Sequence, residues 1–149
     1  MMKKYLASIM FPLLISSPLA IADTKQDEQY NNLKPIASDI FKRSVALAEG
    51  ADDSYQSLKY TDDKTVWRKA RDERRALSVD EKKLGDGLSS PFRYCIHLSA
   101  QSRLLWGQAI PEGKIDVSTF KSYLTAKKDC EDQLNNPPED KSNLRAVEL

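Results

Sequence analysis

Two cysteines constrain the fold of this chain more than any other feature of its sequence. Cys95 and Cys130 lie in two segments whose apolar residues recur at helical spacing, and Pro111-Glu112-Gly113 separates these segments. Cys95 lies 17 residues before Glu112, and Cys130 lies 17 residues after Gly113. Residues equally far from the turn of an antiparallel helical hairpin face each other. The spacing therefore predicts a disulfide that staples a C-terminal hairpin, with two unpaired buried thiols as the alternative.

The first 22 residues predict export. Lys3 and Lys4 make the start basic, an apolar stretch covers residues 6–15, and residues 16–22 end in the small-x-small pattern that signal peptidase recognises. We therefore expect a signal peptide at residues 1–22, cleaved after Ala22, and a single domain at residues 23–149. The residue after the expected cut is not cysteine, so a lipid anchor is not expected. A retained membrane helix is the alternative, although the apolar stretch is short for one.

If the source is a Gram-negative bacterium, export predicts a periplasmic location. Disulfides form and persist in that oxidising compartment, which supports the pairing of the two cysteines. Residues 23–149 contain no apolar run of membrane-spanning length, so we do not expect the mature domain to be embedded in a membrane. Without the two lysines of the signal, the domain carries 21 basic and 22 acidic residues. This balance argues against a nucleic-acid binder that acts through its overall charge.

Helical periodicity and capping signals predict an all-α fold. Pro35 fits a first helical turn, Gly50 fits the end of that helix, and Ser78 has the capping-box spacing to Glu81. The expected helices cover residues 35–49, 61–77, 78–84, 89–110 and 116–135. No alternating run indicates a strand. We therefore expect a small helical bundle of four to five helices with its core at about residues 33–136.

The same signals predict the connecting segments and the buried faces. We expect residues 23–32 to be a polar tail or the frayed start of the first helix, 51–53 an acidic loop, and 139–149 a polar tail. A brief turn is expected around Tyr55 and Leu58. The fourth helix is expected to end before Pro111 and to bury Phe92, Cys95, Leu98, Ser102, Leu105 and Ala109. The expected inward residues of the last helix are Val117, Phe120, Tyr123, Leu124, Ala126, Cys130 and Leu134.

The sequence lacks the common ligand patterns of metals and haem. It has one histidine, no H-E-x-x-H and no C-x-x-C-H, and its three methionines all lie within the first ten residues. The acidic pairs Asp52-Asp53 and Asp62-Asp63 do not have the spacing of a calcium loop, and we interpret them as helix caps. We expect neither a metal site nor a cofactor.

Catalytic residues are not predicted either. His97 could form a triad with Ser99 or Ser102 and an acid, but no G-x-S-x-G motif is present, so we expect a half-exposed helix residue. Paired carboxylates for glycan hydrolysis stay open, because their distances in space are not visible in a sequence. The favoured hypothesis is a protein that is not an enzyme.

The densest charge feature is a basic cluster beside Trp67. Arg68, Lys69, Arg71, Arg74 and Arg75 follow it, and Arg68, Arg71 and Arg75 share one helix face. Such a face fits a phosphate, a glycan acid or an acidic protein surface. The favoured interpretation is nevertheless a solvated face, in which Asp72 and Glu73 pair with Arg68 and Lys69. The candidate partner-binding residues, chosen by residue type, are Trp67, Arg68, Arg71, Arg75, Tyr55 and Tyr60.

The stretch Ile110-Pro111-Glu112-Gly113-Lys114-Ile115, with the Cys95 helix before it and Phe120 and Tyr123-Leu124 after it, resembles periplasmic immunity proteins of type VI secretion systems, of the class that blocks amidases. The resemblance implies a small exported helical protein with a disulfide that binds and inhibits a cell-wall-degrading effector. The leading hypothesis is accordingly a protein-binding domain that acts as an inhibitor or immunity protein. Two alternatives stay open: an accessory subunit or chaperone of an envelope secretion or conjugation apparatus that docks through residues 139–149, and a small glycan- or peptide-bond hydrolase. The sequence does not indicate the oligomeric state.

Overall fold

The computed structural model describes residues 19–138, with side chains from residue 25 onward. Its elements are α1 (Leu19–Glu49), α2 (Ala51–Tyr60), α3 (Thr65–Asp80), the 3₁₀ turn η1 (Glu81–Leu84), α4 (Arg93–Glu112) and α5 (Val117–Asn135). The described part of the chain contains no strand, so the predicted all-α class is confirmed. The expected signal peptide lies mostly outside the described residues, and the expected tail at 139–149 lies wholly outside them.

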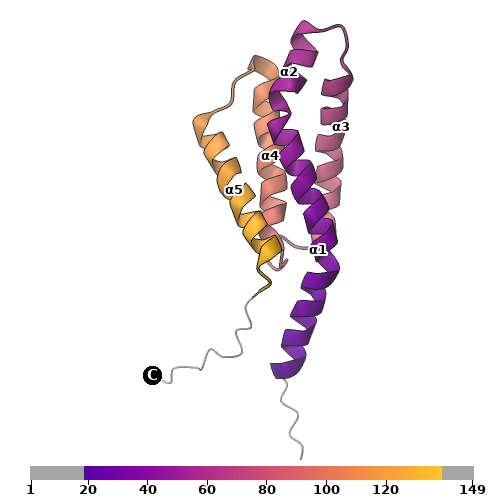
Figure 1. Cartoon of the computed structure of the whole chain (residues 1–149), viewed down its shortest axis with the longest axis vertical. Helices are drawn as coiled ribbons and strands as arrows, with labels where there is room; N and C mark the ends of the chain where they lie inside the picture. Colours follow the sequence, from indigo (N-terminus) through magenta and orange to yellow (C-terminus); the bar gives the residue numbers. More distant parts are fainter. Residues whose placement is uncertain (1–18, 139–149) are drawn as a thin grey trace, which may run out of the picture.

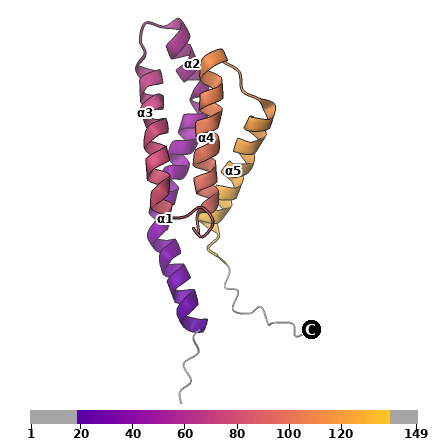
Figure 2. The same ribbon diagram turned by 180° about the vertical axis from the view of Figure 1, so that it is seen from behind.

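The helices form an up-down-up-down bundle in which α1 and α2 together make the first member (Figures 1 and 2). α4 packs against both α1 and α5, whereas α2 packs on α3 and α4. The first turns of α1 extend beyond the end of the bundle (Figure 1). None of the helices between residues 19 and 138 combines the length and the apolar character needed to cross a bilayer.

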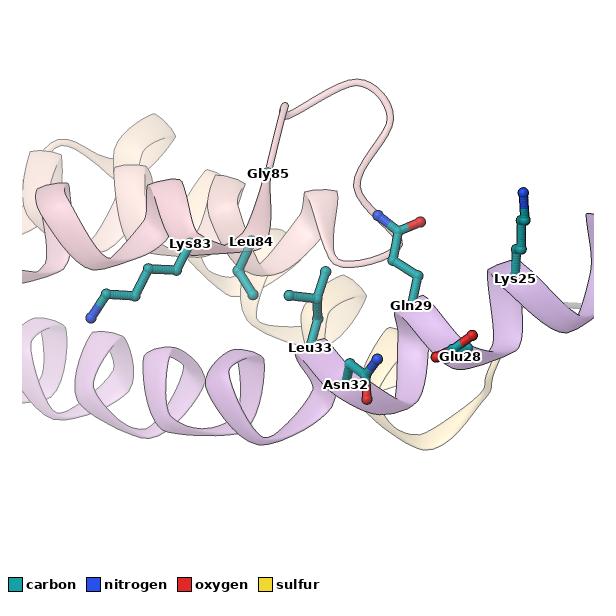
Figure 3. A pocket seen from close by; sticks show the side chains of 8 residues that line it. All are labelled: Lys25, Glu28, Gln29, Asn32, Leu33, Lys83, Leu84 and Gly85. Atoms are coloured by element: carbon teal, nitrogen blue, oxygen red, sulfur yellow. The ribbon is translucent and has the colours of Figure 1, made fainter.

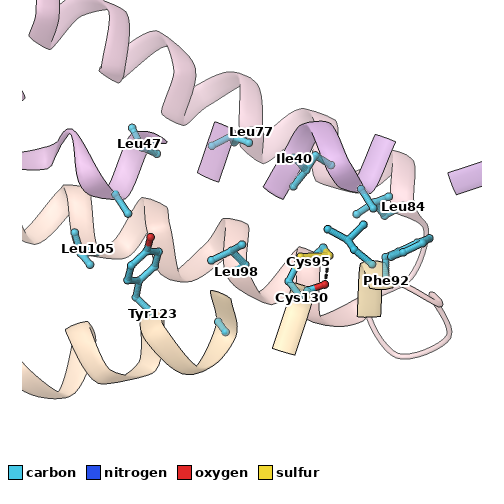
Figure 4. Close-up of a cluster of buried hydrophobic side chains, with 14 of the residues drawn as sticks. Ile40, Leu47, Leu77, Leu84, Phe92, Cys95, Leu98, Leu105, Tyr123 and Cys130 are labelled. Carbon is cyan, nitrogen blue, oxygen red and sulfur yellow. Dashed lines mark hydrogen bonds between the residues drawn. A yellow bond between two sulfur atoms is a disulfide. The ribbon is translucent and has the colours of Figure 1, made fainter. Parts of the chain in front are cut away.

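The core lies where α4 meets its neighbours, and Figure 4 shows its side chains. All six predicted inward residues between Phe92 and Ala109 are buried. Cys95 and Cys130 form the predicted disulfide, with their Cα atoms 4.6 Å apart. Both residues are fully buried beside Leu98. A disulfide of this kind is typical of proteins from an oxidising environment.

The first helix begins well before Pro35, so the predicted start is wrong. α1 contains Pro35 in its interior, although proline removes one backbone hydrogen bond there. The contacts of Tyr30 explain why the residues before Pro35 are helical. Its ring is buried and stacks on Phe92 with centroids 4.8 Å apart, and its hydroxyl donates to the carbonyl oxygens of Gln133 and Leu134 at 2.9 Å. Packing against α4 and α5 therefore outweighs the local cost of the proline.

The predicted acidic loop at 51–53 and the predicted turn at Tyr55 and Leu58 are also wrong, because both belong to α2. Gly50 does end α1, but the chain enters the next helix at Ala51, which is buried. Asp52 and Asp53 occupy the first turn of α2, where carboxylates are favoured by the helix dipole. The acidic residues that suggested a loop thus stabilise a helix start.

Further helix boundaries differ from the prediction: α3 begins at Thr65 and α4 at Arg93, each four residues after the expected start, and the ends of both helices also differ. Ser78 does not begin a new helix, since its hydroxyl donates to the carbonyl of Arg75 at 2.7 Å and α3 continues to Asp80. α4 passes through Pro111 and ends at Gly113, whose φ of 68° places it in the left-handed region. The N–H of Gly113 donates to the carbonyl of Ala109 at 2.7 Å and closes the helix. The backbone hydrogen bond that Pro111 removes near the end of α4 does not end the helix.

The inward face of α5 is narrower than predicted. Tyr123, Ala126, Cys130 and Leu134 are buried as expected. Val117, Phe120 and Leu124 are instead 67%, 47% and 47% exposed. The expected set covered about half of the helix circumference. An edge helix with neighbours on one side only can bury a narrower stripe.

Candidate functional site

The basic cluster lies on α3, which begins after a short loop. The N–H of Thr65 donates to Oδ1 of Asp63 at 2.8 Å, which satisfies a backbone donor at the start of the helix. On the side facing α1, Arg43 donates to Glu73 at 2.5 Å and to Asp80 at 2.8 Å, and it also pairs with Asp39. Burial lowers the pKa of Arg43, but these hydrogen bonds outweigh it and raise the pKa above its ordinary value. The orientation of α3 about its axis is therefore fixed.

The opposite side of α3 presents arginines over tryptophan rings. The guanidinium carbon of Arg71 lies 5.0 Å from the ring centroid of Trp67, and that of Arg74 lies 5.8 Å from the ring centroid of Trp106 on α4. Arg74 also donates from Nε to the carbonyl of Arg103 at 3.3 Å. Both distances are within the range of cation–π attraction. Two arginines are thus held in place before any partner arrives.

We call Trp67, Arg68, Arg71, Arg74, Arg75 and Trp106 the arginine–tryptophan face. Arg68 and Arg75 are exposed, and within residues 25–138 neither forms an ion pair. The expected i, i+4 pairs do not form, because Asp72 binds Arg71 at 3.0 Å and Glu73 binds Arg43. The face therefore keeps a clear positive excess.

Both indole N–H groups of this face are buried donors that lack an acceptor in the described part of the chain. A buried donor without a partner costs about 1–3 kcal/mol. Trp67 is only half-buried, so an approaching surface can reach the region of its ring.

Tyr55 and Tyr60 lie on α2, apart from the α3 residues with which they were predicted. Their rings pack edge to face with centroids 5.8 Å apart, and their hydroxyls are 3.4 Å apart. The hydrogen bond with Tyr60 is the main cause that raises the pKa of Tyr55. The ring of Tyr55 covers Gly113, where an added Cβ would come within 2.6 Å of the ring. Tyr55 therefore locks the α4–α5 loop, and only Tyr60, at 70% exposed, presents a largely free ring.

Two clefts open on α1. One of about 430 Å³ lies between its N-terminal turns and η1, and its lining is mixed in charge (Figure 3). The other, of about 400 Å³, lies among α1, α2 and α3, and its lining includes the apolar Leu47 and Ala70 and the charged Asp53, Lys69 and Glu73. Neither lining includes a histidine or a cysteine.

The single histidine differs in burial from the two serines that were considered as its partners. His97 is exposed on α4, whereas Ser99 and Ser102 of the same helix are buried. Between residues 19 and 138, no group of three or more His, Cys, Asp or Glu side chains is arranged to hold a metal ion.

Sequence reasoning missed the contributions of Trp106 and Arg74 to the arginine–tryptophan face. Trp106 fits the apolar spacing of α4, and its cationic partner lies 32 residues earlier on another helix. No local pattern links the two. Sequence reasoning also failed to predict that some apolar residues of α5 are exposed. The expected inward set was wider than an edge helix can bury, and this width could have indicated it. Comparisons with protein-family models, curated proteins and solved structures find no match to this chain.

Proposed function

We propose that this chain is an exported, periplasmic protein-binding domain, and most concretely an inhibitor or immunity protein of a cell-wall-targeting effector. The observation that carries the proposal is the arginine–tryptophan face, in which Arg71 and Arg74 are held over tryptophan rings. Arginine and tryptophan are enriched at the energetic centres of protein interfaces. Pre-ordered side chains lose less entropy when they bind.

The charge of the face defines the partner surface. Its excess of guanidinium groups favours carboxylates, which bind arginine bidentately. The low overall charge of the chain leaves this face as a local feature, so it steers an acidic surface without making the whole protein a polycation. Blocking a hydrolase in this way requires the domain only to cover or distort the enzyme, and no catalytic residue of its own.

The test is affinity capture with the oxidised protein from periplasmic extract and from extract of a competing strain. The double variant Arg71→Glu/Arg75→Glu is compared with Lys42→Glu/Lys59→Glu, which changes the net charge equally at exposed positions on α1 and α2. We expect one stoichiometric hydrolase to bind the wild type and the control, with at least about tenfold weaker binding to the arginine variant. The captured enzyme should lose activity on purified peptidoglycan when the domain is added.

Capture of envelope-machine components would favour the accessory subunit, and loss of that capture on deletion of residues 139–149 would confirm it. Turnover of peptidoglycan by the domain alone would contradict the inhibitor. Equal affinity of the arginine variant and the wild type would remove the arginine–tryptophan face from the interface.

A further inference from the structure

The outward face of α5 carries an apolar stripe. Val117, Phe120 and Leu124 are spaced by three and four residues, so they lie along one side of the helix. Their exposed fractions are 67%, 47% and 47%, and Ile115 before the helix is 38% exposed. This spacing is that of successive a and d positions in a coiled coil, and α5 uses different residues for its own core.

A row of lysines borders this apolar stripe. Lys121 and Lys128 are both exposed and seven residues apart, so they lie on the same edge at heptad spacing. Lys127 lies seven residues after Phe120 and thus at the next d position, where it donates to Glu49 of α1 at 2.9 Å. The apolar stripe therefore ends before Lys127, and its free basic edge is formed by Lys121 and Lys128.

We propose that the α5 stripe is a docking surface for an amphipathic helix of a partner protein, with apolar residues at heptad spacing and acidic residues beside them. The apolar side of that helix covers Val117, Phe120 and Leu124, and its carboxylates face Lys121 and Lys128. The proposal rests on the proposed function in that the domain acts by binding protein. Its surface is separate, because α3 and α5 lie on opposite sides of α4 (Figures 1 and 2).

The lysine edge selects this occupant over a second copy of the chain. When two α5 helices pair antiparallel with Phe120 of one on Leu124 of the other, residues of the same edge meet across the pair. Lys121 then lies beside the same lysine of the second copy. Like charges at these flanking positions select against a pairing. A partner with glutamate or aspartate at its edge converts the same contact into attraction.

The test uses two synthetic helical peptides of three heptads each, with leucine at a and d, and flanking positions that are glutamate in one and lysine in the other. Fluorescence anisotropy measures their binding to the purified oxidised protein at two salt concentrations. We expect the acidic peptide to bind at least about tenfold more tightly than the basic one, with an affinity that falls as salt rises.

Variants then locate the site. Leu124→Ser should lower the affinity for the acidic peptide at least about tenfold. Leu104→Ser on α4, at 49% exposed against 47% for Leu124, is the matched control and should bind like the wild type. Lys121→Glu/Lys128→Glu should reverse the preference between the two peptides, and circular dichroism checks that each variant folds.

The proposal is overturned if the acidic peptide does not bind, if Leu124→Ser has no more effect than Leu104→Ser, or if the charge reversal leaves the preference unchanged. Loss of peptide binding in Arg71→Glu/Arg75→Glu but not in Leu124→Ser assigns the peptide to the arginine–tryptophan face instead. If sedimentation velocity detects self-association and Leu124→Ser abolishes it, the stripe is assigned to a second copy of the chain. None of these outcomes bears on the capture experiment above, so the two proposals fail separately.

Discussion

Replacing Cys95 and Cys130 together by alanine should destabilise the bundle by about 4 kcal/mol. The disulfide closes a loop with a sequence separation of 35 residues. In the chain-entropy model, closing a loop of this length lowers the conformational entropy of the unfolded chain and so raises the free energy of unfolding by about 4 kcal/mol at 25 °C. Both residues are fully buried, so the two alanines also remove some buried sulfur contact. The total stability of a small domain is about 5–15 kcal/mol, which makes this loss a large share.

The assay is urea unfolding of three samples: the oxidised wild type, the wild type in reductant and the double variant in reductant. We expect the two samples without the disulfide to unfold at similar, much lower urea concentrations than the oxidised wild type. Hydrogen exchange should then show that α5 loses protection first. α5 is an edge helix, and its contacts with α1 include the hydrogen bonds from the Tyr30 hydroxyl and the Lys127–Glu49 ion pair.

A reduced wild type within about 1 kcal/mol of the oxidised protein would refute the entropic reasoning, since loop closure would then contribute little. A double variant much less stable than the reduced wild type would instead assign the loss to packing around the missing sulfurs. An unchanged dependence of the unfolding free energy on urea concentration is needed for either comparison.

Three further predictions follow from single contacts. Gly113→Ala should destabilise the protein by about 1–3 kcal/mol in thermal unfolding, because the residue has a φ of 68° and because the new Cβ would collide with the ring of Tyr55. In a protein that also carries Tyr55→Ala, the collision is absent and only the backbone cost of Gly113→Ala should remain. Tyr30→Phe should cost about 1 kcal/mol and speed hydrogen exchange at the end of α5, since two carbonyls lose their shared donor. Hydrogen bonds with Lys83 and then Arg43 lower the pKa of Asp80, so its carboxylate stabilises the fold above its unfolded pKa of about 4 and this stability is lost as the pH falls through the lower folded value. Asp80→Asn should therefore flatten the acid limb of a stability-against-pH profile, and an unchanged limb would contradict the assignment.

The hairpin could be predicted from the sequence because its signals agree with one another. The two cysteines, the loop around Gly113 and the apolar spacing of both helices all require the same pairing, and the structure has it. The all-α class could be predicted for the same reason. Where several local signals indicate the same structure, tertiary packing and local preference agree.

The errors fall where packing competes with a single local signal. Pro35 signals a helix start, but the buried ring of Tyr30 holds the preceding turns as helix. The acidic residues after Gly50 suggest a loop, yet they suit the first turn of α2. Apolar spacing alone could not separate the buried and exposed sides of α5, because that depends on how many neighbours the helix has.

The candidate site was predictable only within one helix. Arg68, Arg71 and Arg75 of α3 could be assigned to a shared face from their spacing alone. The pairing of Arg74 with Trp106 depends on the approach of α4, and the separation of Tyr55 from α3 depends on its contact with Gly113. Contacts between helices are set by the tertiary fold, and one sequence does not display them.

The position of the disulfide also determines what happens when the chain is cut. Cys95 lies near the start of α4 and Cys130 near the end of α5, so the covalent link closes the hairpin at the end opposite its exposed loop. Residues 113–116 of that loop are all exposed, and Lys114 among them is a trypsin site. A nick there leaves the two fragments joined through sulfur and still packed against each other. The protein should therefore run as one species on a non-reducing gel and as two on a reducing one, so that a cut in this loop leaves the two helices covalently linked.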